Sequence, residues 1–323
     1  MEETIRDDRM IKEVNRHQDE MPPPVDIIIN VSSGATEKEE VRRRLADVFG
    51  ASRIEARISF AETGPEVVAL ARRATRSEAQ TIVAGGGDGT ISAVASTLVG
   101  TSNTLGVLPL GTLNHFARDL GIPLELEAAA RTIIAGHAIS IDVGEVNERI
   151  FLNNSSLGLY PSIVHHRDKQ QRLGHGKWPA FVWAAFTVLR RYPFLDVRLS
   201  ADGKELKSRT PFVFIGNNEY EMESFKIGAR ACLNAGQLSL YVSHRTGRLG
   251  LLRLALRALL RRLRGADDFV ALCSSEIWIE TRRRRMRVST DGEVVVMQSP
   301  LHYRVRPGAL RVIVPEHREA EAE

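Results

Sequence analysis

Residues 81–91 read Thr-Ile-Val-Ala-Gly-Gly-Gly-Asp-Gly-Thr-Ile, an apolar run that passes through glycines into a second apolar segment. The run at residues 81–84 favours a buried strand, and residues 91–98 favour a helix. Glycines have no Cβ atom, so their backbone N–H groups can approach phosphate oxygens closely, and the N-terminus of the following helix adds positive potential. The stretch therefore predicts a phosphate-binding loop, Gly86-Gly87-Asp88-Gly89-Thr90.

Asp88 indicates which phosphate ligand suits this loop. No lysine follows the glycines, so the loop differs from a Walker A loop. A carboxylate beside phosphate is repelled unless a cation lies between them, and Mg²⁺ bound to a nucleotide supplies that cation. We therefore expect ATP with Mg²⁺, and Asp88 as the metal's protein partner. The alternative is a plain strand-to-helix turn in which Asp88 caps the helix.

The segments around the loop alternate between strand and helix patterns. Strand patterns lie at residues 25–31, 54–60, 81–84 and 105–110, and helix patterns lie at residues 37–49, 65–75 and 91–98. Such alternation is typical of a parallel sheet covered by helices. We expect an α/β nucleotide-binding domain over residues 22–141, preceded by a flexible tail at residues 1–21.

The pattern changes after residue 141. Turn signals such as Asp291-Gly292 separate short β-prone runs, which lie at residues 149–153, 195–199, 211–215, 238–242, 276–280, 294–297 and 310–314. This texture is typical of a mostly antiparallel β-sandwich. We expect a β-rich domain over residues 142–315, with an end that can return to the first domain, and a tail at residues 316–323.

Composition and charge indicate in which part of the cell the protein works. The 323 residues carry a net charge of +4, and the two cysteines, Cys232 and Cys273, are not spaced as metal ligands. We therefore expect no disulfide framework, and a cytoplasmic location fits. The first 20 residues lack an apolar signal core. The nearly apolar stretch at residues 178–189 is too short to cross a bilayer.

Further blocks accompany the glycine loop in a fixed order. They are LGVLPLGTLNHFARDL at residues 105–120, IDVG at residues 141–144, FLNN at residues 151–154, FIGNN at residues 214–218 and DGE at residues 291–293. With GGDGT at residues 86–90, this set resembles the diacylglycerol kinase catalytic family, in its bacterial soluble branch related to sphingosine kinases. GGDGT is shared by NAD kinases, but the blocks after residue 105 favour the lipid kinases.

The resemblance implies a two-domain kinase that transfers phosphate from ATP to a lipid hydroxyl, with Mg²⁺ as cofactor and residues 142–315 as the lipid-substrate domain. Glu293 matches the glutamate assigned as proton acceptor, and Asp88 is the second residue we expect in catalysis. The expected nucleotide-binding residues are Asn30, Ser33, Gly34, Gly86, Gly87, Asp88, Gly89, Thr90, Ser92 and Thr112. Some members carry an aspartate that matches Ala235 and helps hold a structural Mg²⁺, so we expect no side-chain ligand for that ion at residues 232–237.

Several of these residues have structural alternatives. Glu293 could be a solvated turn residue, and Thr112 or Asn114 could be the N-cap of a short helix. We interpret Asp291 as a residue that caps its turn, with orientation of Glu293 or of metal as a further role.

A basic stretch points to a membrane surface. Residues 245–264 contain seven arginines and no acidic residue, with leucines at helical spacing. A basic amphipathic helix suits an anionic membrane, so we expect peripheral association with the inner membrane face; the alternative is a helix packed on the sandwich. The stretch lacks interleaved aromatic residues, and we expect no nucleic-acid partner. The sequence leaves a homodimer open. The alternative functions are an NAD kinase and a non-catalytic nucleotide-binding regulatory protein.

Overall fold

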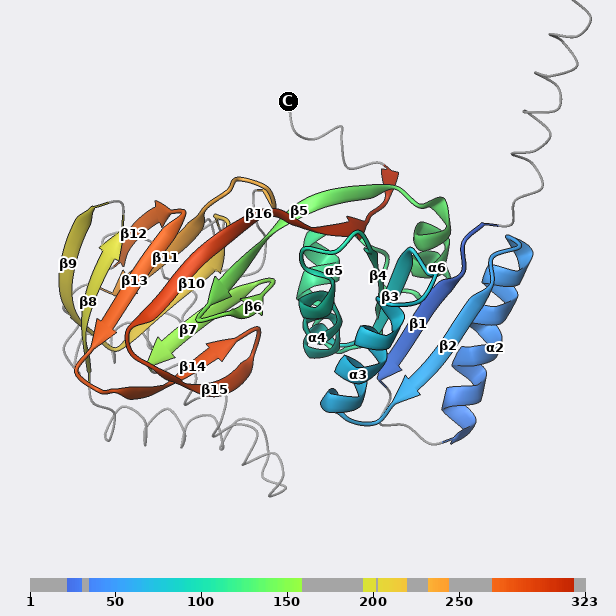
Figure 1. Cartoon of the computed structure of the whole chain (residues 1–323), viewed down its shortest axis with the longest axis horizontal. Coiled ribbons are helices and arrows are strands. Elements are labelled where there is room, and N and C mark those ends of the chain that lie inside the picture. Colours follow the sequence, from blue (N-terminus) through green and yellow to red (C-terminus); the bar gives the residue numbers. More distant parts are fainter. Residues whose placement is uncertain are drawn as a thin grey trace, which may run out of the picture.

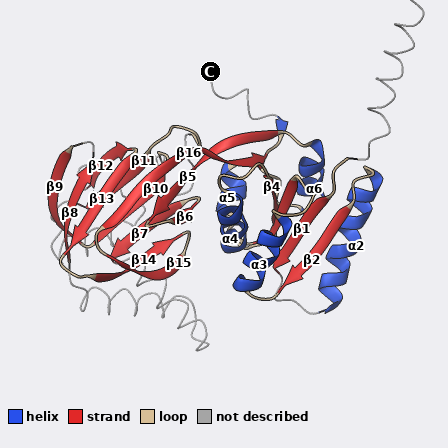
Figure 2. Ribbon diagram, viewed as in Figure 1, coloured by secondary structure: helices blue, strands red, loops and turns tan. Residues whose placement is uncertain are grey.

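A computed structural model describes residues 22–30, 35–158, 194–201, 203–219, 232–243 and 269–316 of the chain. An α/β domain at the N-terminal side is followed by an antiparallel β-sandwich (Figure 1), and helices occur in the first of these two parts while strands fill the second (Figure 2). The predicted fold class is therefore confirmed.

The α/β domain is built on four parallel strands in the order β2-β1-β3-β4. These are β1 (Val25–Asn30), β2 (Ala56–Ala61), β3 (Thr81–Gly86) and β4 (Thr104–Pro109). Their helices are α2 (Ala35–Ala51), α3 (Gly64–Ala74), α4 (Asp88–Leu98), α5 (His115–Asp119) and α6 (Leu126–Ala135). Helix α2 packs against α6, and α3 packs against α4, on the two sides of the sheet (Figure 1). Both faces are covered, which is why Ile27, Ile29 and Ile82 are fully buried.

Two long strands join the two parts of the fold. Strand β5 (Ala138–Val146) pairs in antiparallel fashion with β16 (Leu301–Ile313) along most of its length. The last residues of β16 also pair in parallel with β4, through Arg311 and Val312. The end of the described chain therefore returns to the α/β domain, and β16 runs through both parts in Figure 1.

The sandwich consists of the far half of this first sheet and a second sheet. Past β16 the first sheet continues in the order β13-β8-β9, and a short strand, β6, pairs with β5. The second sheet has the order β12-β11-β10-β7-β14-β15. The bounds are β6 (Arg149–Phe151), β7 (Asn154–Gly158), β8 (Leu195–Ala201), β9 (Lys204–Thr210), β10 (Phe212–Asn217), β11 (Leu238–Ser243), β12 (Phe269–Ser274), β13 (Glu276–Thr281), β14 (Arg285–Thr290) and β15 (Glu293–Gln298). Alternate residues of both sheets, among them Leu157, Val213, Ile277 and Tyr303, form one buried core.

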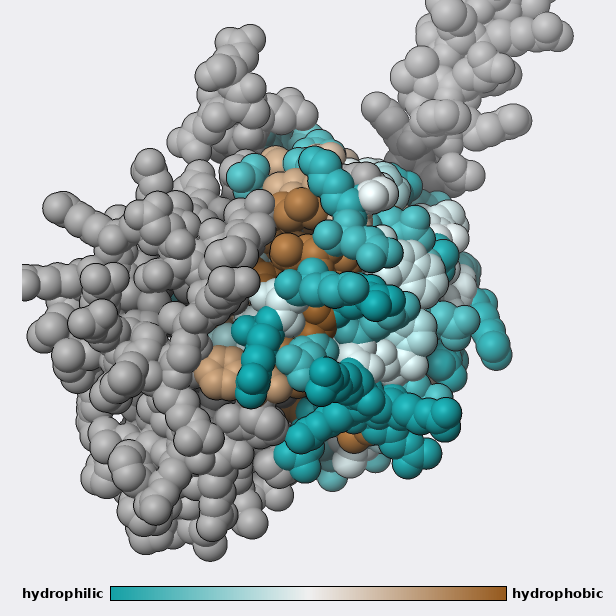
Figure 3. Space-filling model, turned by 90° about the vertical axis from the view of Figure 1, so that its left-hand side faces the viewer, coloured by the Kyte–Doolittle hydropathy of each residue, from teal (hydrophilic) through white to brown (hydrophobic). Residues whose placement is uncertain are grey.

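The edge of the first sheet is protected by charge. Strand β9 carries Lys204, Glu205, Lys207 and Arg209, and hydrophilic residues cover much of the described surface on the face shown in Figure 3. Charged edge strands discourage pairing with other chains. Within the described ranges, no helix is long and apolar enough to cross a membrane.

Helix α4 begins at Asp88, three residues before the start that the apolar pattern predicts. Its first turn contains Gly89, and because glycine has a low helix propensity, the sequence does not predict a helix there. As a result, the glycine loop and the N-terminus of α4 are one continuous feature.

Gly144 of the IDVG block provides a test of the packing between β5 and β6. A Cβ atom at Gly144 would lie 2.2 Å from Cζ of Phe151, which is fully buried. We expect Gly144→Ala to lower the free energy of unfolding by about 1–3 kcal/mol, because the ring has no free volume to move into. Urea denaturation measures this. Gly50→Ala is the matched control, since nothing lies within 4 Å of its added Cβ. Equal stability of the two variants would contradict this packing.

Candidate active site

The glycine loop lies where three parallel strands end. Strand β1 ends at Asn30, and its Nδ2 atom donates a hydrogen bond to Oγ1 of Thr90 at 3.0 Å. Strand β3 ends at Gly86, where an added Cβ would lie 2.7 Å from the Thr90 side chain. Only glycine therefore lets Thr90 turn back over the end of β3. The carboxyl ends of parallel strands are where α/β sheets bind ligands.

A second loop, which follows β4, packs backbone to backbone on the first. A Cβ at Gly111 would lie 2.5 Å from the Gly87 Cα atom. Asn114 folds this second loop: its Oδ1 accepts from the Gly111 N–H at 3.0 Å, and its Nδ2 donates to the Gly111 carbonyl at 2.8 Å. Asn114 makes no side-chain cap bond to α5. Thr112 lies exposed beside this contact.

Asp88 caps a helix, but not its own. Its carboxylate accepts hydrogen bonds from the backbone N–H groups of His115 and Phe116, the first two residues of α5. The two distances are 3.2 and 3.1 Å. These bonds fix the carboxylate at the junction of the two loops. Its remaining lone pairs are available to a cation or a water molecule.

The N-terminus of α4 is suited to an anion. Its N-cap residue is Gly87, which provides no side-chain hydrogen bond. The first N–H groups of a helix have no intrahelical acceptor, and the helix dipole favours negative charge there. The residues present thus fit a phosphate group, because the backbone is open at Gly87 and Gly89.

The carboxylate of Asp291 joins the sandwich to α4. It lies in the turn between β14 and β15. Its Oδ2 accepts the Ser92 hydroxyl and the Leu152 N–H, both at 2.7 Å, and its Oδ1 accepts the N–H groups of Asn153 and Asn154, at 2.8 and 3.2 Å. Burial raises the pKa of the Asp291 carboxyl above its ordinary value of 3.8, and this effect outweighs the four hydrogen bonds, which lower the pKa. The expected turn-capping residue therefore ties three separate segments together.

Glu293 lies two residues further on and faces the glycine loop. An added Cβ at Gly89 would be 3.9 Å from Oε1 of Glu293. The other oxygen, Oε2, accepts from Nη2 of Arg149 at 2.6 Å, while Nε of Arg149 donates to Oγ1 of Thr290 at 2.9 Å. The Glu293 side chain is 59% exposed. The structure thus places an accessible, anchored carboxylate beside the glycine loop.

The described residues fit a metal only together with its ligand. Within them, no group of three His, Cys, Asp or Glu side chains could hold an ion. Mg²⁺ is commonly held by one or two carboxylates plus substrate phosphates and water, an arrangement that Asp88 fits. In the loop at residues 232–237, the N–H groups of Ala235 and Gly236 donate to Asn218 and Asp142. Protein atoms therefore hold this loop, and the expected lack of a side-chain ligand for a structural Mg²⁺ there stays a prediction.

Most of the predicted residues come together in the structure. Those that gather around the N-terminus of α4 are Asn30, Gly86, Gly87, Asp88, Gly89, Thr90, Ser92, Thr112 and Glu293. The Ser92 hydroxyl is engaged with Asp291, and its role as a nucleotide ligand stays a prediction. Ser33 and Gly34 lie outside the described residues. Arg149 was missed, because nothing in the sequence pattern before the FLNN block singles out one arginine.

The raised pKa of Asp291 makes the stability of the folded protein depend on pH. The folded protein holds this proton to a higher pH than the unfolded chain, so above pH 3.8 the folded state binds more protons and its stability falls as pH rises. Asn suits the backbone of this position, which has φ 48°, and does not titrate.

We therefore expect Asp291→Asn to lower the free energy of unfolding by about 1–3 kcal/mol, because the NH₂ group of the asparagine faces backbone donors. The difference between parent and variant should shrink as pH rises from 4 to 7, because the parent loses stability over that range. Urea denaturation of parent and variant at each pH measures the difference between their free energies of unfolding. Other titrating groups contribute equally to both proteins and cancel in this difference. A cost that grows with pH would contradict the raised pKa.

Known proteins match both parts of the fold. Residues 24–146 match the diacylglycerol kinase catalytic domain, and residues 160–314 match the YegS C-terminal NAD kinase beta sandwich-like domain. Diacylglycerol kinases of Staphylococcus aureus strains RF122 and MRSA252 are each 28% identical over 229 residues, 67% of this chain and 69% of theirs.

Solved structures share the whole architecture. A structure from Bacillus anthracis whose assignment as a diacylglycerol kinase is provisional superposes with a TM-score of 0.73 at 23% identity, over 91% of this chain and 98% of its own. A diacylglycerol kinase structure from the same organism superposes with a TM-score of 0.67 at 20% identity, over 91% of this chain and 97% of its own. At such identities these likenesses establish the fold. The two parts of the chain thus match, in order, a diacylglycerol kinase catalytic domain and a YegS-type C-terminal sandwich domain.

Proposed function

We propose that this chain is an ATP-dependent lipid kinase that phosphorylates a hydroxyl group of diacylglycerol or a related lipid. One observation carries the proposal: the Glu293 carboxylate lies 3.9 Å from the position that a Cβ on Gly89 would take, in the loop whose backbone suits phosphate. A base beside a phosphate site is what phosphoryl transfer to an alcohol needs, since this chemistry depends on positioning and charge stabilisation. The similarity to diacylglycerol kinases supports the kinase activity in general terms.

The protein's groups have distinct tasks in this reaction. Backbone N–H groups between Gly86 and Thr90 would hold phosphate oxygens, and Asp88 would hold Mg²⁺ directly or through water. Bound ATP would supply the phosphoryl group, and Mg²⁺, when bound, would offset the negative charge of the phosphates. The lipid hydroxyl gives its proton to Glu293 as its oxygen forms the new bond to the γ-phosphorus. The bond from that phosphorus to the bridging oxygen breaks, and ADP leaves with the electron pair.

The proposed setting is the inner face of an anionic membrane. A lipid with two acyl chains stays in the bilayer, so the enzyme has to reach it there. The arginines of residues 245–264 would supply attraction of about 1 kcal/mol each near such a surface. This basic stretch lies outside the described residues.

A panel of acceptors with radiolabelled ATP and Mg²⁺ tests the function. We expect label in diacylglycerol or a sphingoid lipid in mixed micelles. Glu293→Gln should lower turnover by about 10²-fold or more, because the proton acceptor is lost, while ATP binding stays near the parent value.

The other outcomes favour the alternatives. Label in NAD and in no lipid would make the chain an NAD kinase. ATP binding without transfer to any acceptor would make it a nucleotide-binding regulatory protein. Near-normal lipid turnover in Glu293→Gln would remove Glu293 from the mechanism.

Arg149 is proposed as a positioning residue for Glu293. Its guanidinium binds both Glu293 and Thr290, so it holds the carboxylate at one place on the hairpin. Arg149→Gln should lower kcat by about tenfold to a hundredfold, because small displacements of a catalytic group are costly, and should leave the KM for ATP unchanged. Arg149→Lys should recover part of kcat.

Steady-state kinetics measure these effects. Arg198→Gln is the control, because Arg198 pairs with Glu280 away from the loop. An unchanged kcat in Arg149→Gln, or a change confined to KM, would show that the ion pair does not position the base.

A further inference from the structure

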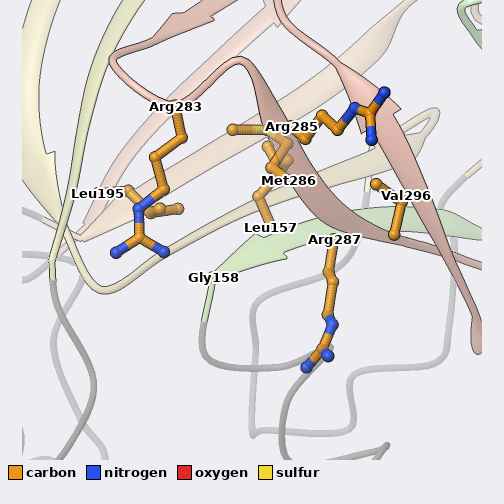
Figure 4. Close-up of a pocket in the computed structure, with 8 residues that line it drawn as sticks. All are labelled: Leu157, Gly158, Leu195, Arg283, Arg285, Met286, Arg287 and Val296. Carbon is orange, nitrogen blue, oxygen red and sulfur yellow. The ribbon is translucent and has the colours of Figure 1, made fainter.

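A cavity opens in the second sheet where the pairing of β7 and β14 ends. Pairing between these strands covers Thr290, Ser289 and Val288, opposite Ser155, Ser156 and Leu157. The next residue of β7, Gly158, pairs with Phe212 of β10 on its other side. The described pairing of the two strands ends at Leu157, and a cavity of about 310 Å³ is lined there by residues of β7, β8, β14 and β15 and by Arg283 (Figure 4).

The lining of this cavity is amphiphilic. Arg283, Arg285 and Arg287 supply three guanidinium groups at alternate positions along one chain segment. The apolar residues of the lining are Leu157, Leu195, Met286 and Val296. In the view of Figure 4, Leu157 and Met286 lie between the side chains of Arg283 and Arg285. Val296 is 66% exposed, which is unusual for a branched apolar side chain.

The three arginines have no counter-ions within the described part of the chain. No carboxylate there pairs with Arg283, Arg285 or Arg287, whereas their neighbour Arg282 pairs with Asp196 at 3.6 Å. Arginines collected around an apolar hollow leave an excess of positive charge. Such a site attracts an anion, and the planar guanidinium groups suit phosphate oxygens.

We propose that this cavity binds the headgroup of an anionic phospholipid of the membrane. The phosphate lies among the arginines, and the part of the lipid next to it contacts Leu195 and Val296, above the buried side chains of Leu157 and Met286. A free phosphate ion would leave the apolar half of the lining without a partner. The volume is at the lower end of small-molecule sites, so it accommodates a headgroup and leaves the acyl chains in the bilayer.

This site also explains how the enzyme would be placed at its substrate. Strands β14 and β15 form part of the cavity wall, and the far end of this hairpin carries Asp291 in its turn and Glu293 at the start of β15. A lipid bound at one end of this hairpin therefore holds the catalytic end near the bilayer. The inference refines the proposed membrane association, but it does not depend on kinase activity.

Vesicle flotation of the full chain tests the proposal. Vesicles of phosphatidylglycerol mixed with phosphatidylcholine are compared with vesicles of phosphatidylcholine alone. The double variant Arg285→Gln, Arg287→Gln is compared with Arg198→Gln, Arg282→Gln, which removes the same charge outside the cavity from arginines that pair with Glu280 and Asp196. We expect the first variant to lose about tenfold or more of its binding to anionic vesicles, and the control to lose much less.

Two further arms identify the source of the phosphate. Val296→Ser should weaken anionic-vesicle binding although every arginine is present and the net charge is unchanged. Inorganic phosphate should displace the parent no better than chloride at matched ionic strength. Equal loss in both double variants would show attraction by general charge and overturn the proposal, as would unchanged binding in Arg285→Gln, Arg287→Gln. Specific displacement by inorganic phosphate would replace the lipid with a free anion.

Discussion

The carboxylate of Asp291 is the constraint on which the candidate site depends. Its two oxygens accept four hydrogen bonds, three from the backbone at Leu152, Asn153 and Asn154 and one from Ser92 on α4. Burial of this group would be costly without those donors. The turn between β14 and β15 is thereby fixed against the helix that begins at the glycine loop. Since Glu293 is two residues away, its position follows from this contact.

The arrangement divides the work between rigid backbone and anchored side chains. An added Cβ would clash at Gly86 and at Gly111, and Gly111 packs backbone to backbone on Gly87, so close packing restricts the shape of the loop. Asp88 holds α5, and Arg149 holds Glu293. A preorganised site of this kind loses little free energy to reorganisation when charge develops. The same hairpin continues to the arginine-lined cavity, so one structural element connects chemistry and proposed membrane contact.

The parts of this structure that arise from local sequence were predictable. The glycine loop, the alternation of strands and helices and the β-rich second part all come from patterns within a few residues, and the resemblance to a family added Glu293. The contacts of Asp291 and Arg149 were not predictable, because they join residues more than 130 positions apart. Asp88 was expected near a metal or as a cap of its own helix, and its bonds to α5 depend on how two loops pack. The cavity depends on where the pairing of two strands ends, which no single segment encodes.

A crystal structure of the chain with Mg²⁺ and a non-hydrolysable ATP analogue tests the central claim most directly. The phosphates should contact the backbone N–H groups between Gly86 and Thr90, and the γ-phosphate should face Glu293 while all four hydrogen bonds of Asp291 are retained. A nucleotide bound elsewhere, or a Glu293 carboxylate turned away from the γ-phosphate with those hydrogen bonds intact, would contradict the placement of the base by Asp291.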